Sequence, residues 1–183
     1  AKMIRAGERA NLLPEMLVTA AFLSIQDPRE RPAEKQQQAD EAHRRFRDPK
    51  SDFLTVVNLW NALQLEGGSN RLFRQFCRKN FLNFNRTLEW RNLVDELREA
   101  VNEKLPQIKL LENIPYDLFH QSILTGVPRN IAKYDGEEQI FVGTGHKKYH
   151  IFPGSGLFKA KPVPEWLMSF VLVETTRVFA RQN

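Results

Sequence analysis

The feature that most constrains this chain is a change in the spacing of its apolar residues after about Pro106. From Leu12 to about Leu105, apolar residues recur at helical spacing, as in PEMLVTAAFLSI, NRLFRQFCRKNFL and RTLEWRNLVDELREAV. A last helix is expected over residues 116–131. β-Branched and aromatic residues then occur in short stretches separated by glycines. The pattern predicts an α+β protein, a helical bundle followed by a partial or small open β-barrel, with β structure confined to the region after about residue 133.

Local signals place the ends of these elements. Pro14 suits a first helical turn, and Ser51 and Ser69 are N-cap residues that precede apolar helical segments. The prolines in DPRERP (27–32) break helix and predict a loop. We expect residues 35–105 to be almost wholly helical. The weakest helix in this prediction is SDFLTVVNLWNAL, because it is rich in β-branched residues. EWLMSFVLVETTRVFA predicts one or two further strands, and the short β region suggests a truncated barrel.

Composition sets broad limits on the class of protein. The 183 residues carry 27 Lys and Arg against 22 Asp and Glu, a net charge of +5 that permits a polyanionic partner. The single cysteine, Cys77, excludes an internal disulfide. No stretch approaches the roughly 20 apolar residues of a membrane span, so we expect a cytoplasmic protein with no membrane partner. The first residues have no apolar signal segment and begin as if partway through a helix, which suggests a fragment.

A tempting motif stands at Asp40–His43, where the letters DEAH spell the name of a class of ATP-driven RNA helicases. In that motif the two carboxylates must follow a buried strand, so that they reach Mg²⁺ and the attacking water. Here they follow the polar run EKQQQA, which predicts an exposed helix, and no G-x-x-x-x-G-K-[ST] phosphate loop occurs in the chain. We therefore expect no catalytic residue, no bound cofactor and no metal site in this chain.

Several longer segments carry a family resemblance. The strings DPRERPAEKQQQADEAHRRF, FCRKNFLNFNRTLEWRNLVDEL, KKYHIFPGSGLF and WLMSFVLVETTRVFAR resemble the helicase-associated region of bacterial HrpA-type DEAH-box RNA helicases. The resemblance implies that residues 1–112 are the end of a winged-helix region and a ratchet-like helical domain. It implies that residues 113–183 are a linker helix and an OB-fold-like domain. ATP, Mg and the two RecA-like ATPase domains are then implied for the parent helicase, outside this chain.

The resemblance further implies that single-stranded RNA runs beside this region. RNA contacts need Arg and Lys along a groove, with aromatic faces or backbone donors beside them. In RLFRQFCRKNFLNFNRTLEWR we expect contact from Arg86 or Arg91, which open the helix that the family places along the RNA channel. The alternative for both is a surface ion pair with Glu89 or Asp95. Arg71 and Arg74 are weaker candidates, because basic residues on an amphipathic helix are usually a solvated face.

A second candidate stretch is GHKKYHIFPGSG. Lys147 and Lys148 lie in an expected hairpin, and Gly154-Ser155-Gly156 offers backbone N–H groups and a hydroxyl for a phosphate. A solvated turn is the alternative interpretation. The fallback is the basic cluster of Arg44, Arg45 and Arg47 that follows the DEAH letters.

Two functions therefore remain open at this point. The first is an RNA-binding accessory region that clamps single-stranded RNA during translocation and unwinding by a helicase. The second is a protein-interaction platform that docks an activator or a ribosomal partner.

Overall fold

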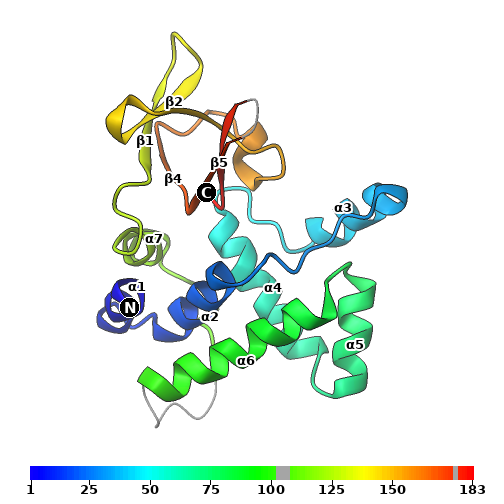
Figure 1. The fold of residues 1–183 in the computed structure, drawn as a ribbon. Helices are drawn as coiled ribbons and strands as arrows, with labels where there is room; N and C mark the ends of the chain where they lie inside the picture. Colours follow the sequence, from blue (N-terminus) through cyan, green and yellow to red (C-terminus); the bar gives the residue numbers. More distant parts are fainter. Residues whose placement is uncertain (102–107, 175–176) are drawn as a thin grey trace.

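The computed structural model describes residues 1–101, 108–174 and 177–183, and Figure 1 shows a helical part below a β-sheet part. The helices are α1 (Lys2–Arg9), α2 (Leu13–Ser24), α3 (Gln36–Arg44), α4 (Asp52–Glu66), α5 (Asn70–Lys79), α6 (Phe84–Val101) and α7 (Tyr116–Leu124). The strands are β1 (Ile131–Asp135), β2 (Ile140–Gly143), β3 (Lys148–Ile151), β4 (Trp166–Met168), β5 (Val171–Glu174) and β6 (Val178–Arg181). We call residues 1–124 the helical part and residues 131–183 the sheet part.

The expected N-caps are present at two helices. Ser51 Oγ accepts a hydrogen bond from Leu54 N at 3.2 Å at the start of α4, and Ser69 Oγ accepts one from Leu72 N at 3.3 Å at the start of α5. The β-branched segment SDFLTVVNLWNAL is helical, as expected. Its valines and Trp60 are buried, so tertiary packing outweighs the modest helix propensity of that stretch.

The helical part packs around a cluster of aromatic rings. Trp90 of α6 meets Phe22 of α2 and Trp60 of α4 edge to face, with ring centroids 5.0 and 4.9 Å apart. Its indole N–H donates to Val18 O at 3.0 Å, so the polar atom of this fully buried side chain is satisfied. These contacts therefore join α2, α4 and α6 at the centre of the helical part.

Helix α7, which directly precedes the sheet in sequence, packs against the other helices of the helical part. Phe119 and Ile123 of α7 pack with Met3 of α1 and Phe53 of α4 in one buried cluster. Figure 1 shows α7 beside α1 and below β1. The linker helix thus anchors the sheet part to the helices.

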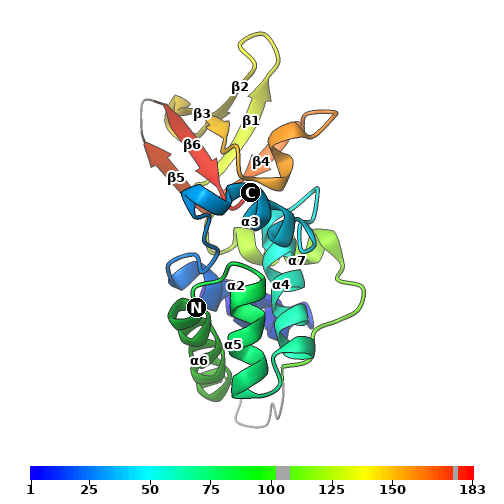
Figure 2. The same ribbon diagram turned by 90° about the vertical axis from the view of Figure 1, so that its right-hand side faces the viewer.

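The strands form one sheet in the order β4-β1-β2-β3-β6-β5 (Figure 2). Neighbouring strands are antiparallel except β3 and β6, which are parallel. One face buries a small core of Phe141, Tyr149, Leu167 and their neighbours. This six-stranded sheet after a helical part is the α+β, OB-like architecture expected from the sequence.

Three boundaries differ from the sequence prediction. The helix expected over 116–131 ends at Leu124, because Gly126 and Pro128 follow at once, and Pro128 cannot donate a helical hydrogen bond. β Structure accordingly begins at Ile131 instead of after about residue 133. The final segment forms three strands, β4 to β6, where one or two were expected.

Other expectations about the helical part are confirmed over the described residues. DPRERP is an extended segment, and the DEAH letters lie on α3, with Asp40 and Glu41 exposed. Residues 36–101 are helical apart from connections at 45–51, 67–69 and 80–83, while 102–105 lie outside the described residues. A single β-bridge between Arg29 and Leu82 is the exception to β structure being confined to the sheet part. None of the described helices is long and apolar enough to cross a membrane.

Candidate nucleic-acid interface

A cleft of about 550 Å³ lies at the junction of the helical and sheet parts. Its lining from the helical part is Asp27, Arg29, Arg31, Asp40, His43, Arg44, Arg47, Asp52 and Thr55, and from the sheet part Phe152, Pro153, Gly154, Ser155, Arg181 and Gln182. Arginine is thus the commonest residue in the cleft. A groove lined by guanidinium groups from two parts of a protein is suited to a phosphate backbone.

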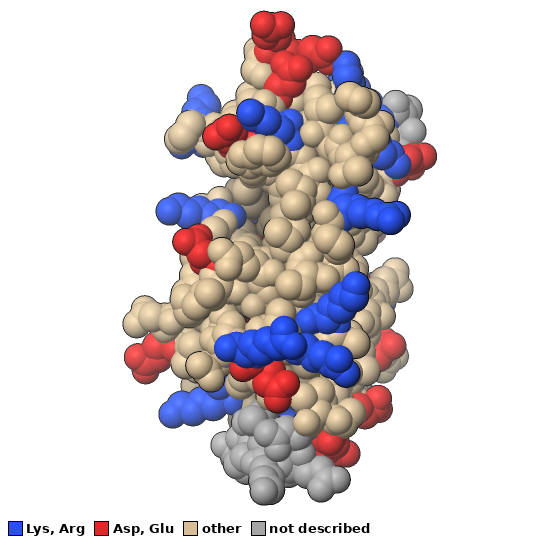
Figure 3. Space-filling model, turned by 90° about the vertical axis from the view of Figure 1, so that its left-hand side faces the viewer, with Lys and Arg blue, Asp and Glu red and all other residues tan. Residues whose placement is uncertain are grey.

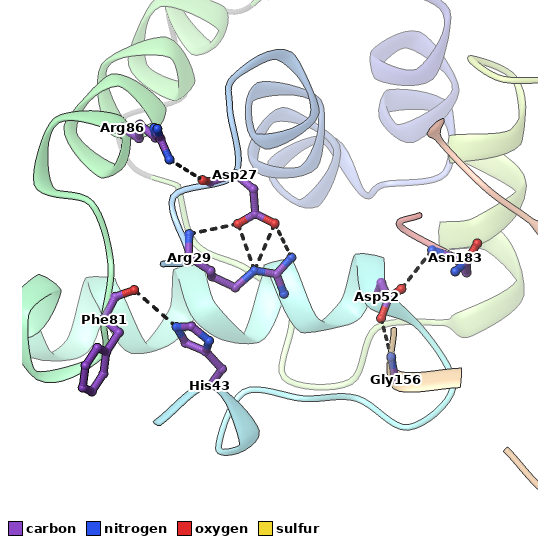
Figure 4. A network of polar contacts seen from close by, with 8 residues as sticks. All are labelled: Asp27, Arg29, His43, Asp52, Phe81, Arg86, Gly156 and Asn183. Carbon is purple, nitrogen blue, oxygen red and sulfur yellow. Dashed lines mark hydrogen bonds and ion pairs between the residues drawn. The ribbon is translucent and has the colours of Figure 1, made fainter. Parts of the chain in front are cut away.

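Asp27 and Arg29 form a tight ion pair in the wall of the cleft (Figure 4). Asp27 Oδ2 accepts from Arg29 Nη2 at 2.6 Å, and Asp27 Oδ1 accepts from Arg29 Nε at 3.0 Å and from the backbone N of Arg29 at 2.9 Å. Burial opposes ionisation of this carboxyl, but the charge and hydrogen bonds of Arg29 outweigh burial and hold the pKa of Asp27 below its ordinary value. The charge of Arg29 is therefore neutralised locally.

The other acidic groups in and beside the cleft also have partners. Asp40 accepts two hydrogen bonds of 2.7 Å from Arg31, and Glu41 pairs with Arg44 at 2.7 Å on the same helix. Both carboxylates of the DEAH letters are thereby engaged in exposed ion pairs. The geometry is that of surface ion pairs, which contribute little stability.

Asp52 joins the two parts at the edge of the cleft. Its Oδ1 accepts from Gly156 N at 2.8 Å, its Oδ2 accepts from Asn183 N at 3.1 Å, and its own backbone N donates to Asn183 O at 2.7 Å (Figure 4). Because Asp52 is the first residue of α4, the helix dipole also favours its negative charge. These contacts hold the sheet part against the N-terminal end of α4.

Two arginines of the cleft are left unpaired by this arrangement. Arg47 from the helical part and Arg181 from the sheet part have no ion-pair partner within the described ranges. The guanidinium carbon of Arg181 lies 4.6 Å from the centroid of the Phe152 ring, which orients it across the cleft wall. Each part of the protein therefore contributes to the cleft one guanidinium that no carboxylate of the described residues holds in an ion pair.

The structure does not bring the five predicted RNA-binding residues together. Arg86 reaches back to the loop and donates to Asp27 O at 3.3 Å, at the base of the cleft wall (Figure 4). Arg91 lies on the face of α6 toward α5, with its guanidinium carbon 4.5 Å from the Phe73 ring centroid. The two arginines therefore serve packing within the helical part, and neither forms the alternative ion pair with Glu89 or Asp95.

The predicted residues of the sheet part also separate. Lys147 pairs with Glu174 at 2.8 Å and Lys148 pairs with Glu138, both on the exposed sheet surface and outside the cleft. Ser155 does line the cleft, but its hydroxyl accepts from Leu157 N at 3.2 Å. The N–H of Ser155 donates to Phe152 O and that of Gly156 to Asp52, so of the GSG run only Gly154 N has no hydrogen bond to a described residue. RNA contact by any of these residues stays a prediction.

Sequence reasoning missed Arg181 and Phe152 as site residues. Both sit in the strand-rich segments HIFPG and VFAR, where an aromatic residue and an arginine each looked like ordinary strand positions. Arg47 was present in the fallback cluster. Arg44 and Arg45 differ from it because they pair with Glu41 and Glu66. The first pair is an i,i+3 contact that the sequence could have indicated, whereas only the folded structure reveals the second.

Comparison with known families decides the relationship of the chain. Residues 1–56 match the family described as helicase associated domain (HA2), ratchet-like, and residues 119–183 match the family described as oligonucleotide/oligosaccharide-binding (OB)-fold. Over 99% of its length the chain is 43% identical to the ATP-dependent RNA helicase HrpA of Escherichia coli (strain K12). It is a helicase-associated region of the HrpA type. The resemblance found in the sequence is thereby confirmed.

The HrpA-type region is similar to further helicases at lower identity. It is 42% identical to the HrpA homologue of Haemophilus influenzae and 24% identical, again over 99% of the chain, to the probable ATP-dependent RNA helicase DHX35 of Homo sapiens. The chain spans 14% of the length of each HrpA relative and 25% of the human one. The cleft of the HrpA-type region lies between the segments that match the two families.

Proposed function

We propose that this region contacts single-stranded RNA as an accessory part of an ATP-dependent RNA helicase, with the strand lying in the cleft between the helical and sheet parts. The observation that carries the proposal is that Arg47 from the helical part and Arg181 from the sheet part line the same cleft and have no ion-pair partner among the described residues. A strand held from one side alone slides freely, whereas contacts on two elements clamp it. The OB-fold family match and the RNA helicase relatives support the same ligand.

The chemistry of the cleft favours contact with phosphates over reading of bases. A guanidinium presents a planar fork of donors that fits a phosphate, and neither Arg47 nor Arg181 is held by a carboxylate. Few side-chain amides or free backbone groups face the cleft, so we expect binding with little sequence preference. The Phe152 ring, already covered on one side by Arg181, offers a stacking surface for an unpaired base.

The test measures affinity for a 5′-fluorescein-labelled oligouridine by fluorescence anisotropy across a salt series. Arg47→Ala, Arg181→Ala and the double variant are compared with Arg5→Ala/Arg9→Ala, which removes two exposed arginines of α1 outside the cleft. Each lost phosphate contact should weaken binding and lower the slope of log affinity against log salt by about one. The control should keep both affinity and slope.

A second variant set decides between this cleft and the residues singled out from the sequence. If the cleft alone holds the strand, the quadruple change of Arg86, Arg91, Lys147 and Lys148 to alanine should leave the affinity close to that of wild type, whereas the RNA contacts predicted from the sequence require a loss of affinity. Loss of binding in that variant, together with wild-type binding in Arg47→Ala/Arg181→Ala, would move the RNA path away from the cleft.

The remaining components of a helicase are proposed to lie in the rest of a longer protein. ATP and Mg would be bound by RecA-like ATPase domains, since this chain has no phosphate loop and the carboxylates of Asp40 and Glu41 are held in ion pairs. The role proposed for this region is to hold the strand while those domains move it.

A further inference from the structure

A second and larger hollow lies at the same junction. This apolar groove of about 1330 Å³ runs between α7 and the edge strand β4. Asp52 lines the arginine cleft, while its hydrogen-bond partners Gly156 and Asn183 line the apolar groove. The same contact therefore separates the two hollows.

The groove exposes large apolar side chains that a folded chain normally buries. Trp166 is 58% exposed and Tyr116 is 43% exposed, and both line the groove. Leu124, Ile131, Met168, Pro162 and Pro164 continue the lining. On the face of the molecule that Figure 3 shows, Lys and Arg side chains lie above and below a central area with few charged side chains. Contiguous apolar surface with a polar rim is typical of an interaction site.

The rim of the groove is positively charged. Lys50, Lys159 and Lys161 line it, and none of the three has an ion-pair partner among the residues that the structure describes. Among the described residues that line the groove, Asp117 is the only Asp or Glu. Such a groove complements a ligand with an apolar centre and negative charges around it.

We propose that this groove docks a peptide segment of a separate protein partner, in which large apolar side chains are flanked by Asp or Glu. The apolar residues would cover Trp166 and Met168, while the carboxylates would meet the rim lysines. Aromatic anchors of this kind dominate binding energy at protein interfaces. RNA fits less well, because the described lining residues include no arginine and the apolar lining has no counterpart on a phosphate backbone.

Docking here would also affect the arginine cleft. The groove takes its lining from both parts, with Tyr116 and His120 from α7 and with Leu157 and Trp166 from the sheet part. A bound peptide would hold the two parts in one arrangement and so pre-organise the cleft that they share. This second step rests on the proposed RNA-binding function, whereas peptide docking itself does not.

The test begins with a random 16-residue peptide library displayed on phage and selected on the immobilised chain. We expect enrichment of peptides with apolar residues and flanking Asp or Glu. Synthetic, fluorescein-labelled versions should bind about ten-fold more weakly to Trp166→Ala and about three- to ten-fold more weakly to Lys159→Glu/Lys161→Glu. Leu65→Ala, at a leucine that is 87% exposed outside the groove, and Lys79→Glu/Lys109→Glu are the matched controls and should keep wild-type affinity.

Several outcomes would overturn the docking proposal. These are a library that gives no enriched sequences, enriched peptides that bind the groove variants as well as wild type, and oligouridine binding that is lost in Trp166→Ala. A second set of peptides covers the rest of the sequence of the Escherichia coli relative. Tight binding by one of them would assign the groove to the same polypeptide instead of a separate partner.

If the peptide binds as expected, it should also raise oligouridine affinity about five-fold or more. Unchanged RNA affinity with peptide bound would refute only the proposal that the peptide pre-organises the arginine cleft. Lack of any RNA binding would refute only the proposed function.

Discussion

At the scale of single residues, two half-buried histidines hold connections of the fold in their neutral form. His43 Nε2 lies 3.3 Å from Phe81 O, and His120 lies 2.7 Å from both Ser51 Oγ and Tyr116 O through its two ring nitrogens. Burial, only partly offset by hydrogen bonds, lowers the pKa of each imidazole below its ordinary value of 6.5. Charged groups also act on these pKa values: Arg29 lowers and Asp27 raises that of His43, while Asp48 and Asp117 raise that of His120.

These two lowered pKa values predict a loss of stability on acidification. As pH falls through about 6.5, the unfolded chain binds protons on His43 and His120 while the folded protein does not, so the free energy of unfolding decreases. Thermal unfolding between pH 7.5 and 5.5 should show Tm falling with pH. His43→Asn/His120→Asn should reduce that slope, whereas His146→Asn, at an exposed position, should not. A double variant with the wild-type slope would show that other groups cause the pH dependence.

At the scale of the elements, α4 and α5 have the same kind of N-cap in different surroundings. Ser51 is fully buried and its hydroxyl is shared between Leu54 N and the His120 ring, while Ser69 is exposed and bonds only Leu72 N. An exposed cap lost to alanine leaves a backbone donor that water can satisfy. A buried cap lost to alanine leaves two polar groups without a partner.

Ser51→Ala should therefore destabilise the protein more than Ser69→Ala. We expect a cost of about 1 kcal/mol or less for Ser69→Ala and about 2–3 kcal/mol for Ser51→Ala, measured by urea unfolding. Equal costs for the two caps would mean that the contact of Ser51 with α7 adds nothing to stability.

At the scale of the whole molecule, the junction between helices and sheet depends on a close approach at Gly156. A Cβ placed there would meet the backbone oxygen of Asp48 at a distance that real Cβ atoms do not show. Gly156 also donates its N–H to Asp52, so the backbone of the sheet part lies directly against the start of α4. Only glycine allows both contacts.

Gly156→Ala should force the two parts to shift. The expected cost is about 1–3 kcal/mol in urea unfolding, because the clash is with backbone and not with a flexible side chain. Affinity for oligouridine should fall as well, since the arginine cleft spans the same junction. Gly136→Ala is the matched control, because a Cβ there has open space around it. If the two glycine variants behaved alike, the junction would not depend on close packing at Gly156.

The sequence by itself determined the elements of this protein, and the tertiary structure decided its site. Helical spacing, N-cap serines and β-branched runs act over a few residues, so α4, α5, the DPRERP loop and the change to β structure were predictable. The end of α7 was predicted too late, at residue 131 instead of Leu124, although Gly126 and Pro128 are local signals for it. Which arginines lack an ion-pair partner was predictable only in part, because Arg29 and Arg44 pair with carboxylates two and three residues away, which a local pattern can indicate. Arg45, in contrast, pairs with Glu66, 21 residues along the chain. Arg47 and Arg181 line one cleft only because folding brings together segments that are far apart in the sequence, and no local pattern encodes such packing.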